Sequence, residues 1–571
     1  MSARWKTSVG LLVVVALIAS LSLAGCNASS GGGSQSQTGT EVQKGGTMSY
    51  YVGEPAYIDP YNTQESEGTA VEQSLFDSLT KVDPLDATKI LPAAADSWEP
   101  NADATVWTFK LNKNGKYSDG TPVTANDFIY AWNRIVSPKT VNTLTKKADP
   151  SVISYHLSFV QGYDDVQSGK IPALTGMKAV DDLTLEITLS KPFADFAYVC
   201  AHPALAPVPQ KYVEEGVEYN GKTVPYGDMP VGNGPFKMAE PWKHSQYIKT
   251  VANENYWATK PNIDGVEFKI FKDVETAYTE FEAGNLDFTQ VGEGKIKDAV
   301  AKYGESENGY TVNPQKQVLL GEENATYFMI FNEKDAVIKN QKLREALSLA
   351  INRQAICDVV FDGTRSPADN IVPPGIAGYV KGTWKNAAYD VEAAKKALAD
   401  AGYPNGEGLA PIKLSFNSGA GHEKIMELVQ ADWEKIGVKS TFDSAEFAVY
   451  LKQLDAGKFQ VARLGWIADY PIMDNFLFPL FTTGAGDNKS QYSNPEVDKG
   501  LEAARAITDQ TQRLQAYQDQ NVTIAENLPV APIMFYKHHH VGSSRLNNFT
   551  YDPSGIPDFV SVWITGGSAA K

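Results

Sequence analysis

The stretch "IKLSFNSGAGHEKIMELVQADWEKIGVKSTF" (residues 412–442) decides the fold class. Its residue pattern is that of a strand, a glycine turn, a helix and a second strand, in that order. This succession is a β-α-β unit. The chain is therefore predicted to be α/β, or mixed α+β, rather than all-β.

Other segments also alternate between strand and helix patterns. "TVWTFKLN" (residues 105–112) and "LTLEITLS" (residues 183–190) alternate apolar and polar residues, as half-buried strands do. "VTANDFIYAWNRIV" predicts a helix with Thr124 as its N-cap and Asp127 completing a capping box. The segment that starts at residue 341 has one apolar stripe at helical spacing, formed by Leu343, Ala346, Leu347, Ala350 and Ile351.

Length and charge limit the functional class. The chain has 571 residues, 43% of them hydrophobic, and a net charge of −17. A chain of this length is too long for one ordinary core, so we expect two or three domains. The negative charge argues against nucleic acid as a partner, because phosphates would be repelled.

The N-terminus has the pattern of a secretory signal, with a basic start, an apolar run and small residues before Cys26. The apolar run is shorter than the ~20 residues that a transmembrane helix needs. Leu23-Ala24-Gly25-Cys26 resembles the lipobox of bacterial lipoproteins, so residues 1–25 are predicted to be a lipoprotein signal peptide and Cys26 the lipidation site. Residues 26–44, rich in glycine and serine, are predicted to be a flexible tether. The alternative is an ordinary signal peptide with a stray cysteine.

No catalytic motif is found, and the chain is predicted not to be an enzyme. It has no G-x-S-x-G, H-E-x-x-H or G-x-x-x-x-G-K-[ST] sequence. "GAGHEK" lacks the third glycine of a dinucleotide turn, so a plain tight turn is the better interpretation. On a strand, His538 and His540 would share a face and could bind a metal. An incidental surface tract over residues 538–540 is favoured, because no carboxylate or cysteine is close in sequence. No cofactor and no metal are expected.

Two cysteines follow the lipobox. Cys200 and Cys357 lie far apart in the sequence, and an exported protein of this length does not need a disulfide. They are interpreted as two buried thiols, and a disulfide between them is the alternative.

Several longer motifs resemble one family. The segment "YSDGTPVTANDFIYAWNRIVSPKT" (residues 117–140) is similar to the signature region of the peptide/nickel-type substrate-binding proteins that serve ABC importers. Further motifs follow in that family's order, namely "VGNGPFKM", "NENYWATKPNIDGVEFKIFKD", "AYTEFEAGNLDF", "FNEKDAVIKNQKLREALSLAINRQAI" and "ARLGWIADY". The resemblance runs from about residue 45 to the C-terminus and is closest to the oligopeptide-binding lipoproteins.

The resemblance implies a periplasmic-binding-protein-like two-lobed clamp with an extra inserted domain. Lobe I would consist of discontinuous segments, lobe II would be inserted within it, and a ligand would be held between lobes I and III. The expected boundaries are residues 45–76, 210–317 and 537–571 for lobe I, 77–209 for lobe II and 318–536 for lobe III.

The resemblance also implies a binding site. In oligopeptide binders the G-W-x-x-D motif supplies the aspartate that holds the peptide α-ammonium, a role that falls on Asp469. Arg463 and His422 match positions that receive the peptide C-terminal carboxylate, and Gly465 and Trp466 match residues that line the cleft. A buried charge must be paired or it is costly, and a zwitterionic ligand needs an anion at one end and a cation at the other. Arg463 and Asp469 are six residues apart, at most ~20 Å in an extended chain.

The site departs from the family in two places. Where the family has a glutamate and a valine in contact with peptide, this chain has Gln64 and Ser66. The tyrosine expected shortly after "SPKT" is not evident in "VNTLTKK". The alternative to a binding role is that Asp469 caps a turn before Pro471 and that Arg463 forms an internal salt bridge.

The expected function is that of a receptor anchored by lipid to the bacterial cell membrane, outside the cytoplasm. It would bind oligopeptides, deliver them to the permease subunits of an ABC transporter, and act as a monomer. The alternatives are the same fold with another ligand (a dipeptide, a nickel chelate, haem or an oligosaccharide), a peptide-sensing receptor without transport, and an anchored hydrolase.

Overall fold

The computed structural model describes residues 42–292, 294–418 and 421–566. The predicted signal peptide, Cys26, most of the predicted tether and the "GA" of "GAGHEK" lie outside the described residues. From Gln43 onward the chain forms one unit. It contains helices together with parallel and antiparallel strands, so the predicted mixed α/β class is confirmed. Within the described ranges, no helix is long and apolar enough to span a bilayer.

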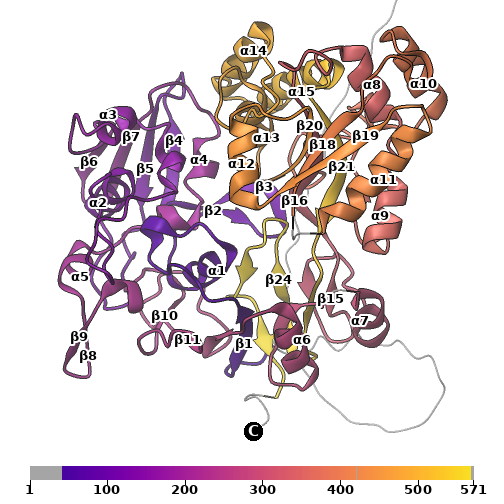
Figure 1. The fold of residues 1–571 in the computed structure, drawn as a ribbon. Coiled ribbons are helices and arrows are strands. Elements are labelled where there is room, and N and C mark those ends of the chain that lie inside the picture. The colour runs from indigo at the N-terminus through magenta and orange to yellow at the C-terminus, as the bar shows by residue number, and fades with distance from the viewer. Residues whose placement is uncertain (1–41, 293, 419–420, 567–571) are drawn as a thin grey trace, which may run out of the picture. The chain divides into compact units, whose positions relative to one another are not determined.

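A six-stranded sheet contains the predicted β-α-β unit. The spatial order of its strands is β17 (Ser366–Pro367), β21 (Val530–Lys537), β16 (Glu322–Phe331), β20 (Val461–Ile467), β18 (Ile412–Asn417) and β19 (Ser440–Ala445). Helix α11 (His422–Glu434) joins β18 to the parallel strand β19, which confirms the prediction from that segment. Figure 1 shows α9 (Arg353–Phe361) and α11 along one side of this sheet, and α12 (Phe447–Asp455) and α13 (Met473–Phe481) along the other.

The predicted apolar stripe belongs to one helix and to the junction that follows it. Helix α8 (Gln341–Leu349) ends before Asn352, whose side chain accepts a hydrogen bond from the backbone of Ala355 and caps α9. An asparagine cap satisfies a donor at a helix start. The stripe is buried throughout, as its spacing predicts.

A seven-stranded sheet is assembled from distant parts of the chain. The spatial order of its strands is β10 (Phe236–Met238), β11 (Tyr247–Ala252), β12 (Gly265–Ile270), β1 (Thr47–Val52), β13 (Phe288–Gln290), β22 (His540–Gly542) and β15 (Val318–Leu319). The N-terminal strand β1 pairs in parallel with β12, and the C-terminal strand β22 pairs with β13 and β15. The chain therefore leaves this sheet twice and returns to it.

A four-stranded antiparallel sheet contains both predicted alternating strands. Its order is β4 (Ala95–Pro100), β5 (Val106–Leu111), β7 (Thr184–Thr188) and β6 (Met177–Asp181). Helix α2 (Ala125–Val136) follows Thr124, whose backbone N–H and hydroxyl both donate to the Asp127 carboxylate at 2.7 and 2.9 Å. The predicted helix start is therefore confirmed.

The other elements range from two-residue strands to the 18-residue helix α15. The helices are α1 (Ser66–Leu75), α3 (Tyr163–Gln167), α4 (Phe196–Val199), α5 (Gln210–Glu215), α6 (Val274–Glu282), α7 (Ile296–Tyr303), α10 (Val391–Asp400), α14 (Pro495–Arg505) and α15 (Gln510–Asn527). The strands are β2 (Thr80–Asp83), β3 (Asp86–Pro92), β8 (Val217–Tyr219), β9 (Lys222–Val224), β14 (Thr311–Val312), β23 (Leu546–Asn547), β24 (Phe549–Tyr551), β25 (Pro557–Asp558) and β26 (Trp563–Ile564).

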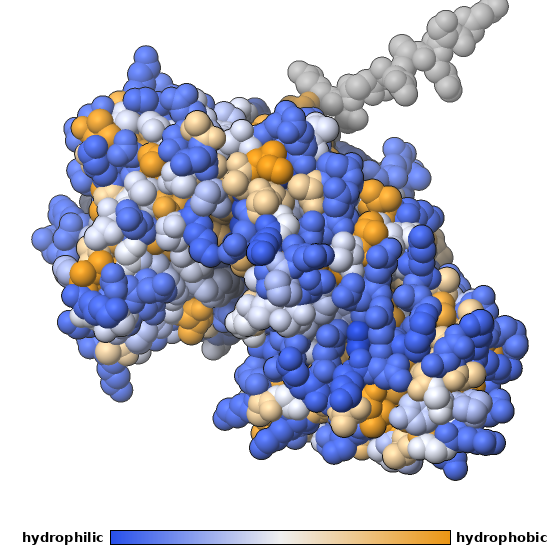
Figure 2. All heavy atoms as spheres, turned by 90° about the horizontal axis from the view of Figure 1, so that it is seen from above, coloured by the Kyte–Doolittle hydropathy of each residue, from blue (hydrophilic) through white to orange (hydrophobic). Residues whose placement is uncertain are grey.

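Two large apolar cores account for most of the buried side chains. One lies within residues 327–534, and the other combines residues from 48–319 and 546–564 with Tyr470 and Ile472. Cys200 belongs to one core and Cys357 to the other, so both are free, buried thiols as predicted. Most of the face in Figure 2 is hydrophilic, and apolar residues are scattered over it, as on soluble proteins generally.

Two short crossovers connect the six-stranded and seven-stranded sheets. One runs from Leu319 in β15 to Glu322 in β16, and the other from Lys537 in β21 to His540 in β22. The two crossovers are hydrogen-bonded to each other, since the backbone N–H of His538 donates to Gly321 at 2.9 Å. The sheet changes at these residues; the lobe boundaries themselves stay a prediction.

Candidate functional site

Strand β20 carries three of the predicted ligand-binding residues, namely Arg463, Gly465 and Trp466. It lies between β16 and β18, with Gly465 opposite Tyr327 and Arg463 opposite Met329. Side chains two residues apart share a face of a strand, so Arg463 lies on the same face as the Gly465 position. After Ile467 the chain turns through Asp469 into α13.

Asp469 is a partly buried carboxylate without a cationic partner among the described residues. Its Oδ1 accepts a hydrogen bond from the Tyr155 hydroxyl at 3.2 Å, and its Oδ2 accepts one from the Asn475 amide at 3.1 Å. Burial raises the pKa of this carboxyl, whereas the hydrogen bond from Asn475, the nearby imidazole of His202 and the hydrogen bond from Tyr155 act in the opposite direction. The alternative for this residue, a cap on the turn before Pro471, is not what the side chain forms, because its two oxygens accept from Tyr155 and Asn475.

Tyr155 is a site residue that the sequence comparison did not identify. It lies in a short 3-10 helix (Ser154–Leu157), later in the chain than the segment where a tyrosine was expected. Its ring packs on His156 at 4.2 Å between centroids, and His156 packs on His202 at the same distance. Burial lowers the pKa of both histidines to about 3. They are therefore neutral at physiological pH and leave the Asp469 charge unpaired.

Arg463 is a buried cation without a carboxylate partner in the part of the chain that is described. It is 9% exposed, and its guanidinium donates to the Asn417 side chain, with Nε at 2.9 Å. The guanidinium carbon also lies 5.5 Å from the centre of the Tyr327 ring. An internal salt bridge, the alternative for this residue, is not observed.

Three buried polar atoms of this group have no hydrogen-bond partner among the described residues. The atoms concerned are the Tyr327 hydroxyl, His422 Nε2 and Arg365 Nη1. The rings of Tyr327 and His422 are 5.7 Å apart, those of Tyr327 and Tyr536 are 6.4 Å apart, and the Arg365 guanidinium lies 4.6 Å over Tyr536. Since a buried polar group without a hydrogen bond is costly, this row of donors is suited to an anion.

Two details of this donor row bear on its chemistry. Burial, with a smaller effect of Arg463, lowers the pKa of His422 to about 4, so this histidine is neutral at pH 7. Burial also lowers the pKa of Arg365, which the sequence comparison had missed. The only signal for Arg365 would have been a basic residue before the "SPAD" turn, and such residues are common.

Gly465 and Trp466 lie as a site wall would require. A Cβ at Gly465 would be 2.8 Å from the Tyr536 hydroxyl, so the absence of a side chain lets Tyr536 pack against β20. The Trp466 indole N–H donates to Asn475 Oδ1 at 3.1 Å, which fixes the ring beside Asp469.

Gln64 and Ser66 are not joined to this group by a hydrogen bond in the described structure. Gln64 is exposed in the turn before α1, and Ser66 is the first residue of that helix, where its hydroxyl donates to Glu67 at 3.2 Å. Their predicted contact with a ligand stays a prediction.

The histidine tract is not an incidental surface feature, and that interpretation was wrong. His538 and His540 are 2% and 7% exposed, because this segment is the crossover between two sheets. His538 Nδ1 lies 3.3 Å from Glu323 Oε1, and its Nε2 donates to the backbone oxygen of Asp552 at 2.8 Å. The described residues contain no cluster of three or more side chains suited to hold a metal.

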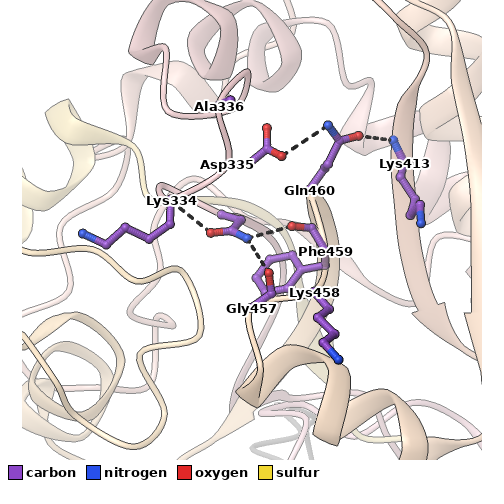
Figure 3. Close-up of a pocket in the computed structure, with 9 residues that line it drawn as sticks. Lys334, Asp335, Ala336, Lys413, Gly457, Lys458, Phe459 and Gln460 are labelled. Carbon is purple, nitrogen blue, oxygen red and sulfur yellow. Dashed lines mark hydrogen bonds between the residues drawn. The ribbon is translucent and has the colours of Figure 1, made fainter.

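One surface pocket of about 420 Å³ lies elsewhere, at the start of β20 (Figure 3). Its lining includes Lys334, Asp335, Lys458 and Gln460, but none of the predicted site residues. Asp335 and Gln460 point toward each other, whereas the side chains of Lys334 and Lys458 extend away from them. The pocket therefore has no converging set of charges and is not the candidate site.

A fold of this class, with unpaired opposite charges in and just after one buried strand, is that of a solute-binding protein. The chain belongs to the bacterial extracellular solute-binding proteins, family 5 Middle, whose family profile matches residues 89–488. Proteins of this family bind solutes, which confirms that the chain is not an enzyme.

Individual relatives are similar along most of their length. The oligopeptide-binding protein OppA of Bacillus subtilis is 29% identical over 567 residues, covering 97% of this chain and 98% of that one. The heme-binding protein A of Haemophilus influenzae is 29% identical over 572 residues, covering 96% and 98%. Among solved structures, the murein tripeptide-binding protein MppA in its unliganded open form has a TM-score of 0.77 at 28% identity and covers 92% of this chain and 99% of that one.

Proposed function

We propose that this protein binds oligopeptides outside the cytoplasm and delivers them to an ABC permease, while Cys26 anchors it to the membrane by lipid. The observation that carries the proposal is a charge imbalance. Among the described residues, Asp469 has no cationic partner and Arg463 has no anionic one. A peptide zwitterion has a charge of the required sign at each end.

The physical argument compares the free energy of the two buried charges in the empty protein and in the ligand-bound protein. A partly buried charge without a counter-ion destabilises the empty protein, and a bound ligand that supplies both counter-ions removes that cost. The unpartnered hydroxyl of Tyr327 and Nε2 of His422 lie beside Arg463, which supports a carboxylate at that end. The lobes would close on the ligand by rotation at the two crossovers.

Asp469→Asn tests the amino-terminal half of the proposal. We expect the variant to lose affinity for peptides with a free amino terminus by about thirtyfold, the ~2 kcal/mol typical of removing one partner of a buried charge pair. Calorimetric titration with trialanine, tetraalanine and pentaalanine, each free and N-acetylated, measures this. The wild type should strongly prefer the free forms, and the variant should not.

The control keeps the fold and changes a carboxylate that already has its own partner. Asp498 lies on α14 and accepts a hydrogen bond from the backbone N–H of Thr483. Asp498→Asn should bind all six peptides like the wild type. Native mass spectrometry that finds a haem, a metal chelate or a glycan in the purified protein, and no peptide, would refute the proposed ligand class.

A further inference from the structure

Asn475, in the first turn of α13, contacts both predicted residues at the amino-terminal end of the site. Its Oδ1 accepts hydrogen bonds from the Trp466 indole at 3.1 Å and from the Asp469 backbone N–H at 3.0 Å. Its Nδ2 donates to Asp469 Oδ2 at 3.1 Å. We propose that Asn475 is the residue that positions the Asp469 carboxylate for the ligand amino terminus, an inference that rests on the proposed function.

The contacts leave one orientation for the Asn475 amide. An indole N–H and a backbone N–H are donors only, so the atom that faces them must be the oxygen. The amide nitrogen then faces the Asp469 carboxylate. Asn475 is 2% exposed, so water does not compete for these bonds. One side chain therefore fixes the backbone and one carboxylate oxygen of Asp469 and the ring plane of Trp466.

A neutral donor at this place preserves the charge of Asp469. The Asn475 amide stabilises the ionised carboxylate without supplying a positive charge, so the ligand can still supply it. The neighbouring residue shows the opposite arrangement. Asp474 is fully buried and makes two 2.7 Å bonds to Arg505, which neutralises it within the protein. Two adjacent residues in one helical turn therefore act differently. Asp474 forms an ion pair within the protein, whereas Asn475 leaves the charge of Asp469 free to pair with a ligand.

Asn475→Asp is the decisive variant. It keeps an oxygen that can accept from the Trp466 indole, but it replaces the amide N–H that donates to Asp469 with a carboxylate oxygen, so that two carboxylates face each other. Two carboxylates at this distance repel, so one pKa of the pair rises. We expect the affinity for tetraalanine to rise with pH between pH 5 and 8 in this variant, because the pair gains negative charge over that range. The wild-type affinity should be flat from pH 6 to 8.

Asn475→Ala gives a second measurement. It removes the donor to Asp469 and the acceptor for Trp466, and we expect the ratio of the affinities for free and N-acetylated tetraalanine to fall at least tenfold. Asn521 provides a matched control in the same part of the chain. It is also 2% exposed, and its Oδ1 accepts from the Trp384 indole at 2.9 Å. Asn521→Asp and Asn521→Ala should change the unfolding temperature but neither the ratio nor the pH profile.

The outcomes separate this inference from the proposed function. If Asp469→Asn keeps the wild-type preference for a free amino terminus, the proposed anchor itself is wrong. If Asp469→Asn behaves as expected but Asn475→Asp keeps the wild-type pH profile, the positioning role of Asn475 is refuted, whatever Asn475→Ala does. A pH profile that changes in Asn475→Asp and not in Asn521→Asp supports it.

Discussion

At the residue scale, Gly465 shows how a missing side chain shapes the anion-binding end. The Tyr536 hydroxyl occupies the space that a Cβ would fill, and Arg365 lies over the Tyr536 ring. The position of Arg365 therefore depends on a glycine in the neighbouring strand β20. The dependence acts through packing at Gly465 and through the cation–π contact between Arg365 and Tyr536.

We predict that Gly465→Ala weakens recognition of the ligand carboxylate. Tyr536 must shift to relieve a 2.8 Å contact, and Arg365 would move with it. A strained side chain costs about 0.5–1.5 kcal/mol, which corresponds to a roughly three- to tenfold loss of affinity. The measurement compares tetraalanine with its C-terminal amide. Gly486→Ala, where a Cβ meets open space, is the control. Equal losses for the acid and the amide would contradict the prediction.

The sequence was informative for some site residues and silent for others. Arg463 and Asp469 stand out because opposite charges flank a tryptophan in an otherwise apolar segment, and the structure leaves both without ionic partners. Tyr155 and Asn475 could not be predicted, because their roles come from contacts with Asp469. The histidine tract was misjudged for the same reason, since its carboxylate neighbour Glu323 is more than 200 positions away in the chain.

At the element scale, His244 connects the β10–β11 hairpin to the loop after β1 through its side-chain contacts. Its Nδ1 lies 2.9 Å from Glu54 Oε1 and its Nε2 2.9 Å from Asp228 Oδ1. Two carboxylates face the two ring nitrogens, so the imidazolium form satisfies both. Burial lowers the pKa of His244, but the bonds to Asp228 and Glu54 outweigh it, and the pKa is raised overall.

We predict a pH-dependent loss of stability in His244→Gln. A histidine with a raised folded pKa contributes stability that is complete below its unfolded pKa of about 6.5 and is lost as pH rises through the folded value. The side chain is 49% exposed, so solvent screening limits the effect to about 1 kcal/mol. Urea unfolding at pH 6 should show this loss, and unfolding at pH 9 should not. A loss of the same size at both pH values would show that the contact is not ionic.

Helices and strands could be predicted from the sequence where neighbouring residues alone determine them. The β18-α11-β19 unit and the start of α2 follow from spacing and capping residues. The break between α8 and α9 was missed, because the apolar stripe continues past the end of α8 to Ile351, just before Asn352 caps the second helix. Short strands such as β13 and β15 have no periodicity to detect, since they form only by pairing with a distant strand.

At the scale of the whole molecule, the sequence could not indicate which distant segments contact each other. One contact joins residues 191–196 to α14 and α15. The backbone N–H of Ala194 donates to Arg505 at 2.7 Å, Lys191 pairs with Glu502 at 2.8 Å, and Asp195 pairs with Arg513 at 2.7 Å. The Lys191–Glu502 pair lies at the surface, whereas the Asp195 and Arg513 side chains are each 7% exposed.

We predict that breaking the Asp195–Arg513 pair destabilises the protein more than removing it. In Arg513→Met, burial already raises the pKa of Asp195, and the arginine that opposed this effect is absent. Leaving one buried charge unpaired costs about 3–5 kcal/mol, whereas replacing both partners by apolar residues is often neutral. The unfolding temperature should therefore fall in Arg513→Met and recover in the double variant Asp195→Leu/Arg513→Met.

The surface pair Lys191–Glu502 provides the control for this contact. Exposed ion pairs contribute about 0–1 kcal/mol, so Lys191→Met should leave the unfolding temperature nearly unchanged. If the double variant at Asp195 and Arg513 is as unstable as Arg513→Met alone, the loss comes from packing and not from an unpaired charge. The contact would then owe its strength to Arg505, whose guanidinium lies between Phe478 and Phe193 at 3.2 and 5.0 Å from their ring centres.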